Sequence, residues 1–129
     1  MAHWDGLNYA VIGIGGFLGA NARYVVANWM AERFGFAFPY GTLVINVTGS
    51  FAIGVFLTLI SDRFAIDPHW RLFFSVGFLG AYTTFSAFTA ESISLLLAGE
   101  WLLGLINIAG SVVLGLIAVM GGIALARAI

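Results

Sequence analysis

The sequence has neither cysteine nor lysine among its 129 residues. Without cysteine there are no disulfides, no thiol catalysis and no iron–sulfur clusters, and without lysine there is no P-loop and no Schiff base. Charged residues make up only 9% of the chain, whereas 61% is hydrophobic. Soluble domains are about a quarter charged. The composition therefore excludes a water-soluble monomer and intrinsic disorder, and we expect one domain over residues 1–129.

The few charges also exclude other classes of function. The chain has five arginines and six acidic residues, which gives a net charge of -1. It therefore lacks the excess of basic residues that is typical of proteins that bind nucleic acids. His3 and His69 lie too far apart for the ligand spacing of a metal site. Membrane spans of about 20 residues each would take up most of the chain. We therefore expect a protein that is not an enzyme and that binds no nucleic acid.

Four apolar segments, 9–30, 42–60, 72–98 and 101–126, are each long enough to cross a bilayer as a helix. The tryptophans fall at the ends of these segments, as in an interfacial aromatic belt: Trp4, Trp29, Trp70 and Trp101. The pattern predicts an all-α protein with four transmembrane helices and both termini on one side. Only Gly99 and Glu100 separate the last two segments, which predicts an antiparallel hairpin.

The charges between the spans only weakly predict an orientation in the membrane. Arg63, Arg71 and Arg127 lie on the side of the termini, and Arg33 lies on the other. Such a small bias permits insertion in both orientations, and it also fits ordinary insertion with the N-terminus inside. Four helices cannot readily enclose both a packed core and a pore, so we expect an oligomer.

Small residues recur at four-residue spacing. Gly15 and Gly19 form one such pair and Ser50 and Gly54 another, a spacing that lets helix backbones approach closely in lipid. Ordinary glycine content of membrane helices is the alternative explanation.

Polar side chains recur on three spans. Thr42, Asn46 and Ser50 share one face of the second span, and Asn107 and Ser111 share one face of the fourth. On the third span, a polar centre is followed by Ser86, Glu91, Ser92 and Ser94. Each polar group in a membrane helix needs a partner. Hydrogen bonds between helices would explain any one of them. Together they suggest an aqueous or ion-conducting path.

The centre of the third span, residues 77–88, contains glycines and paired threonines, which are poor helix formers. We expect the helix to break between Gly80 and Thr83. Irregular backbone at this depth is tolerated only where it is buried or lines a cavity. Exposed carbonyls could bind a cation such as sodium, and the new helix N-terminus would favour anions. A continuous helix with a tight contact between small residues is the alternative.

Phe85 and Phe88 are three residues apart and share a helix face. Phenyl rings have positive edges that can face an anion, although plain packing gives the same pattern. Arg23, inside the first span, could snorkel to the interface, pair with an acid or set a positive potential at a pore mouth. Glu91 could carry protons or be a structural hydrogen-bonded group.

The order and spacing of these residues resemble the Fluc (CrcB) fluoride channels of bacteria over essentially the full length. The motifs that carry the resemblance are Gly16-x-x-Gly19-x-x-x-Arg23, Tyr40-Gly41-Thr42-x-x-x-Asn46-x-x-Gly49-Ser50-Phe51-x-x-Gly54, and Gly77-Phe78-Leu79-Gly80-x-x-Thr83-Thr84-Phe85-Ser86-x-Phe88 with Glu91 after it.

The resemblance implies an antiparallel, dual-topology homodimer in the bacterial inner membrane, with two pores built from both subunits. Phe85 and Phe88 would line the ion path, with Asn46 as the pore amide. Gly80 and Thr83 would offer backbone carbonyls to a structural sodium ion at the dimer interface. Further residues would belong to the polar lining or a vestibule: Thr42, Ser86, Glu91, Ser111 and Arg23.

Two positions depart from relatives. Asn107 stands where some carry tyrosine, and Gly115 where some carry serine. The roles of the polar residues along the fourth span therefore cannot be transferred directly from those relatives. This difference bears on the route of the anion more than on the inference that the anion is fluoride.

The leading hypothesis is a passive, fluoride-selective channel that exports cytoplasmic fluoride and relieves its toxicity. Its expected partners are fluoride, the lipid bilayer and a second copy of the chain, with no other protein. The alternative is a small dual-topology, proton-coupled multidrug antiporter with Glu91 as the carrier.

Overall fold

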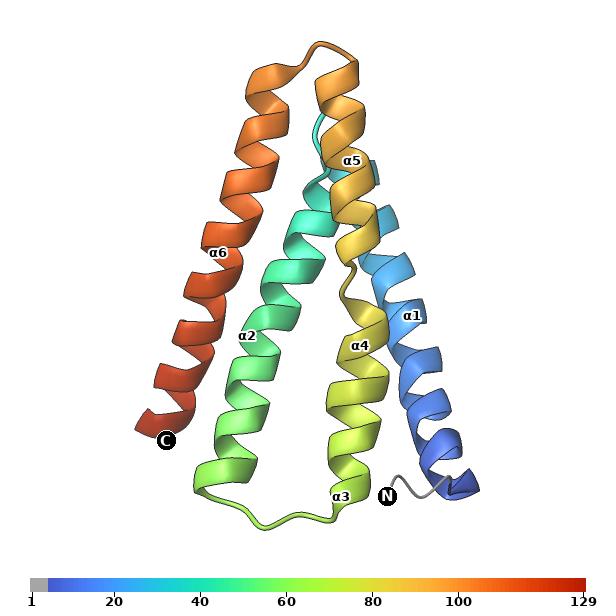
Figure 1. Ribbon diagram of the computed structural model, residues 1–129, viewed down its shortest axis with the longest axis vertical. Helices are drawn as coiled ribbons and strands as arrows, with labels where there is room; N and C mark the ends of the chain where they lie inside the picture. Colours follow the sequence, from blue (N-terminus) through green and yellow to red (C-terminus); the bar gives the residue numbers. More distant parts are fainter. Residues whose placement is uncertain (1–4) are drawn as a thin grey trace.

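The computed structural model describes residues 5–129, and Figure 1 shows their arrangement. His3 and Trp4, which the sequence analysis named, lie outside the described residues. The elements are α1 (Gly6–Phe34), α2 (Tyr40–Asp62), α3 (Pro68–Trp70), the π-helix η1 (Arg71–Leu79), α4 (Gly80–Tyr82), α5 (Phe85–Leu97) and α6 (Trp101–Ala128). The elements from α3 to α5 together form the third span.

The prediction of four membrane-spanning helices is confirmed. Over the described residues, four helical segments are long and apolar enough to cross a membrane: Gly6–Phe34, Tyr40–Asp62, Pro68–Leu97 and Trp101–Ala128. Most of them extend a few residues beyond the predicted bounds, because polar end residues continue the helix after the apolar run has stopped. The start of α1 and the end of α6 lie at the same end of the molecule (Figure 1), as predicted.

Local sequence explains where several helices begin and end. The Asp5 carboxylate accepts a hydrogen bond from the Leu7 N–H and caps α1, and Asp67 caps α3 in the same way through the His69 N–H. That backbone bond also holds the pKa of the Asp67 carboxyl below its usual value. Gly35 and Gly99 follow α1 and α5 with φ of 76° and 83°, a conformation that favours glycine.

Close contacts at glycines confirm the predicted close approach of helix backbones, and the structure shows that α1 approaches the third span. A Cβ added at Gly15 would meet the Phe73 carbonyl, and one at Gly19 would meet the Phe78 carbonyl. A Cβ at Gly54 would meet the Val119 carbonyl at 2.5 Å, so α2 approaches α6 equally closely. In a membrane this van der Waals contact between backbones is a main source of helix association.

The packing order differs in part from the predicted hairpin of the last two spans. The helices α5 and α6 touch near the Gly99 turn, but α6 then diverges and packs mainly on α2, which lies between α6 and the third span in Figure 1. The first span packs on η1 and α4. A two-residue turn sets the direction of two helices, but small residues further along decide which neighbour each helix contacts.

The first half of the third span contains a π-helix, η1, that the sequence analysis did not predict. A π-helix pairs each N–H with a carbonyl five residues back and often marks a functional segment. Hydrophobic patterning does not reveal this change, because apolar residues surround the whole segment. Phe74, Phe78 and Tyr82 stack along it, with ring centroids 5.6 and 5.9 Å apart.

Candidate functional site

The third span breaks at Thr83 and Thr84, at the C-terminal end of the predicted interval. Both residues have extended backbone conformations, with ψ of 157° and 116°. The α-helix resumes at Phe85, capped by the Thr84 hydroxyl, which accepts from the Ala87 N–H at 3.2 Å. The predicted helix break near Gly80 to Thr83 is therefore confirmed, and the alternative of a continuous helix is wrong.

The Asn46 side chain from α2 supports this break. Its amide Nδ2 donates to the Thr84 carbonyl at 2.9 Å, and its Oδ1 accepts from the Thr84 N–H at 2.8 Å. One amide thereby satisfies both backbone groups of a residue that is only 8% exposed. Unpaired backbone groups are costly in a bilayer, so the break depends on a polar residue at this position of α2.

The break frees the two carbonyls that the sequence analysis singled out. In a continuous helix the Gly80 carbonyl would accept from the Thr84 N–H, which instead donates to Asn46. The Thr83 carbonyl would accept from the Ala87 N–H, which instead donates to the Thr84 hydroxyl. The carbonyl oxygens of Gly80 and Thr83 therefore lose the N–H donors that a continuous helix would give them.

A cavity of about 360 Å³ lies beside the break. Its lining comes from α2 and the third span: Asn46, Gly49, Ser50, Ile53, Ser75, Leu79, Gly80, Thr83, Thr84 and Phe85. A Cβ at Gly49 would meet the Thr83 side chain, so a small residue is needed there for α2 to reach the break. Gly80, Thr83 and Phe85, the first residue of α5, therefore line one cavity.

Phe85 and Phe88 lie on the first turn of α5 and face the same side, as predicted. Their ring centroids are 6.0 Å apart and the planes are tilted by 52°. Phe85 is 77% exposed, whereas Phe88 is only partly exposed. An exposed ring beside a helix N-terminus offers positive ring edges next to a positive helix end, a combination that favours an anion.

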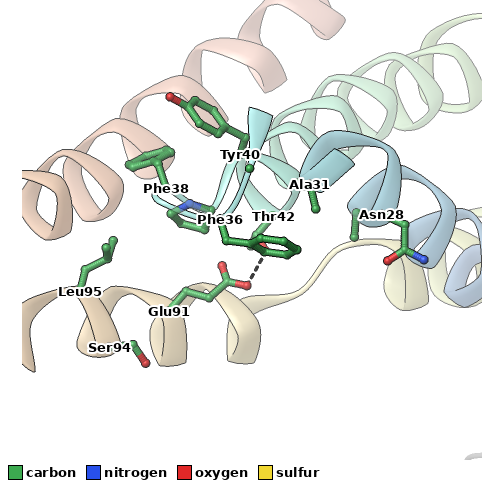
Figure 2. Close-up of a pocket in the computed structure, with 13 residues that line it drawn as sticks. Asn28, Ala31, Phe36, Phe38, Tyr40, Thr42, Glu91, Ser94 and Leu95 are labelled. Atoms are coloured by element: carbon green, nitrogen blue, oxygen red, sulfur yellow. Dashed lines mark hydrogen bonds between the residues drawn. The ribbon is translucent and has the colours of Figure 1, made fainter. Parts of the chain in front are cut away.

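Thr42 and Glu91, 49 residues apart in the chain, form a second polar cluster. The Thr42 hydroxyl donates to Glu91 Oε1 at 2.9 Å (Figure 2). The other carboxylate oxygen, Oε2, is buried and has no hydrogen-bond partner within the described part of the chain. Both residues line a cavity of about 420 Å³ under the loop between α1 and α2, and Figure 2 shows Phe36 and Phe38 from this loop beside them.

The polar residues of α6 face inward to α5. Asn107, only 2% exposed, donates from Nδ2 to Ser92 Oγ at 2.9 Å, and Ser92 Oγ donates to the Phe88 carbonyl at 2.7 Å. Ser111 donates to Asn107 Oδ1 at 3.3 Å. The interpretation of hydrogen bonding between helices therefore holds for Asn107.

The remaining predicted residues lie at different distances from the break. Ser86 Oγ is 3.4 Å from the Thr84 hydroxyl and belongs to the same turn. Arg23 is partly exposed on α1, and no ion pair joins it to an acid among residues 5–129. The structure thus brings together Asn46, Gly80, Thr83, Phe85 and Phe88, pairs Thr42 with Glu91, and leaves Arg23 apart.

Sequence reasoning missed Thr84 and the role of Ser92. Thr84 precedes the resumed helix, and threonine is a favoured N-cap residue, so this preference could have located the start of α5. Nothing local identifies Ser92 as the acceptor for an amide from α6, because that contact depends on how α5 and α6 pack.

The fold and the site define a small multi-pass membrane protein with a broken span, in which an anion-favouring helix end lies beside freed carbonyls. Residues 10–123 match the family described as CrcB-like protein, Camphor Resistance (CrcB). The chain belongs to this family.

Curated relatives cover most of the chain. A protein of Sulfurihydrogenibium sp. (strain YO3AOP1) is 43% identical over 121 residues, which are 94% of this chain and 98% of the relative. One of Rhizobium meliloti (strain 1021) is 48% identical over 119 residues, 92% of this chain and 95% of the relative. One of Chloroflexus aurantiacus (strain J-10-fl) is 50% identical over 95 residues, 74% of this chain and 75% of the relative. Each of these relatives is named fluoride-specific ion channel FluC.

Proposed function

We propose that this protein is a passive, fluoride-selective channel that exports cytoplasmic fluoride and so relieves its toxicity. The observation that carries the proposal is the Asn46-supported break, which begins a helix at Phe85 and presents Phe85 and Phe88 beside it. The names of the relatives support fluoride as the ion. They do not support the alternative of a multidrug antiporter.

The chemistry of hydrogen fluoride explains why a passive channel suffices. The neutral acid crosses membranes and dissociates in a near-neutral cytoplasm, which traps the anion. A selective conduit lets the membrane potential, negative inside, drive fluoride out without ATP or a cofactor for transport. We place the protein in the bacterial inner membrane, where this potential exists.

Selectivity would come from replacing the hydration shell of a small, hard anion. The edges of Phe85 and Phe88 and the hydroxyl of Ser86 lie on the first turn of α5 and would contact the ion. The Asn46 amide would act on the path chiefly by holding the turn, because Thr84 uses one amide hydrogen. The hydroxyls of Thr42 and Ser111, with Glu91, would line its polar surroundings, and Arg23 would lie near a vestibule.

We further propose that the working unit is an antiparallel, dual-topology homodimer with two pores. Only five hydrophobic side chains among the described residues are buried, whereas many large apolar side chains, including Phe85, Leu116 and Met120, are exposed. The exposed Phe85 also lines the cavity at the break, so a second copy that covers Phe85 would close this cavity. A closed pore needs walls that one chain of four helices does not supply.

A structural sodium ion is proposed at the contact between the two breaks. Sodium prefers hard oxygen ligands, and the freed carbonyls of Gly80 and Thr83 fit that preference. The ion would neutralise the carbonyl dipoles and hold the two broken spans together.

Fluoride efflux from liposomes tests the function. Purified protein is reconstituted into vesicles loaded with potassium fluoride, and fluoride and chloride electrodes follow release after valinomycin is added. We expect rapid, valinomycin-dependent fluoride release and no chloride release. Absence of fluoride release from well-folded protein would overturn the proposal, and Glu91→Gln would then test proton-coupled transport.

Sodium removal tests the proposed structural ion. We expect fluoride efflux to be lost when sodium is replaced by a bulky organic cation throughout purification and assay, and to return when sodium is restored. The freed carbonyls repel one another unless a cation lies between them. Full efflux and an unchanged dimer in sodium-free buffer would rule the ion out.

A further inference from the structure

Two side-chain amides, the partly buried Asn46 and the buried Asn107, hold the short segment that carries Phe85 and Phe88. Asn46 from α2 binds both backbone groups of Thr84, immediately before Phe85. Asn107 from α6 donates to Ser92, which donates to the carbonyl of Phe88 itself. The two rings therefore lie between an attachment to α2 and an attachment to α6.

The number of available protons decides which group donates in the hydrogen bond between Asn107 and Ser92. A serine hydroxyl has one proton, and Ser92 uses it on the Phe88 carbonyl at 2.7 Å. Its oxygen must therefore accept from its other partner, and the Asn107 Nδ2 group supplies that hydrogen at 2.9 Å. The Asn107 oxygen accepts from Ser111 at 3.3 Å, so both ends of the amide are engaged within one chain.

This arrangement affects the geometry of α5 at Phe88. A serine that bonds back to the carbonyl four residues earlier bends its helix slightly at that turn. Ser92 and Asn107 are 3% and 2% exposed, so water does not compete for these bonds. The bond from α6 keeps Ser92 in the rotamer that holds the Phe88 carbonyl, and with it the direction in which the Phe88 ring leaves the helix.

We infer that Asn107 is a positioning residue for Phe88, acting through Ser92, and is not itself a ligand of the transported anion. This inference rests on the proposed function for its transport consequence. It differs from an ion-lining role because a residue that is 2% exposed, with its amide bonded on both sides, offers little to a passing ion.

Two variants test the inference. Asn107→Leu keeps the approximate volume and removes the donor, and Ser92→Ala removes the relay. Each is expected to lower the fluoride efflux rate about three- to twentyfold, the range that corresponds to one interhelical hydrogen bond in a membrane. Both changes break the same chain of hydrogen bonds, so their effects should not add. The efflux rate of the double variant is therefore expected to be no lower than that of the more impaired single variant. Ser92→Thr keeps the hydroxyl and should retain efflux.

A spectroscopic readout separates positioning from general stability and from the transport assay. With 4-fluorophenylalanine in place of Phe88, the ¹⁹F resonance of the assembled protein is expected to shift in Asn107→Leu and in Ser92→Ala. The matched control is Asn21→Leu, which removes an exposed asparagine whose amide bonds only to the Phe17 carbonyl of its own helix. It should leave both resonance and efflux unchanged.

The outcomes are distinct. An unshifted resonance in both variants would overturn the inference, as would additive losses of efflux in the double variant. If Asn107→Leu does not assemble, the ¹⁹F resonance and the efflux rate of Ser92→Ala decide the test, because alanine is well tolerated in helices. If the unaltered protein does not transport fluoride, the proposed function fails while the ¹⁹F comparison still reports on the position of the ring.

Discussion

Phe85→Ile and Phe88→Ile are each expected to lower the fluoride efflux rate by about tenfold or more, equivalent to about 1.4 kcal/mol of barrier. Isoleucine preserves an apolar side chain of similar bulk but has no ring and therefore no positive edge. The two rings lie 6.0 Å apart on the turn that follows the break, so an ion passing there would meet both. Efflux from liposomes with matched protein content provides the measurement.

The control for the ring variants is Phe17→Ile. Phe17 lies on α1 and is 69% exposed, similar to the 77% of Phe85, so the same change is made on an exposed ring that does not line the cavity at the break. Efflux should persist in the control, and all variants should keep the oligomeric state of the unaltered protein in detergent. Unchanged efflux in both Phe85→Ile and Phe88→Ile would remove the phenyl rings from the mechanism.

Asn46→Leu is expected to abolish most fluoride efflux and to lower thermal stability. The change removes the side chain that, among residues 5–129, bonds both the N–H and the carbonyl of Thr84, a residue that is 8% exposed. Each interhelical hydrogen bond in a membrane contributes about 0.6–2 kcal/mol, and two are lost together. The backbone would then regain its bonds by re-forming helix through Thr83 and Thr84, which would turn Phe85 and Phe88 away from their present direction.

Efflux assays and thermal unfolding in detergent measure the two effects of Asn46→Leu. Asn21→Leu is again the matched control, since it makes the same substitution at an exposed site. A variant with reduced stability and normal efflux would show that the bonds to Thr84 serve folding alone. Normal values of both would show that the break does not depend on Asn46.

Much of the architecture follows from local composition. Four apolar runs ended by tryptophans are sufficient for four spans, because the thickness of a bilayer sets the length of each helix. The break was also predictable, since glycines and paired threonines in the middle of a long span are poor helix formers. The carbonyls of Gly80 and Thr83, which the resemblance proposes as sodium ligands, lie at this break, and their role stays a prediction.

Contacts between distant residues were not predictable from local pattern. The sequence analysis named Thr42 and Glu91 separately, and the structure joins them by a hydrogen bond across 49 residues. It also treated Asn107 as part of a polar track, whereas its amide bonds to Ser92. The π-helix η1 was missed because a change of hydrogen-bond partner within an apolar segment leaves hydrophobic periodicity almost unaltered.

The sequence by itself determined that this is a membrane protein of four helices with a broken third span and a pair of phenyl rings just beyond the break. Those properties depend on hydrophobicity, helix propensity and spacing, which act between near neighbours in the chain. Only the tertiary structure decided that Asn46 supports the break and that Asn107 reaches Phe88 through Ser92. A hydrogen bond requires two groups at about 3 Å with suitable angles, and only the packing of α2, α5 and α6 brings these groups so close.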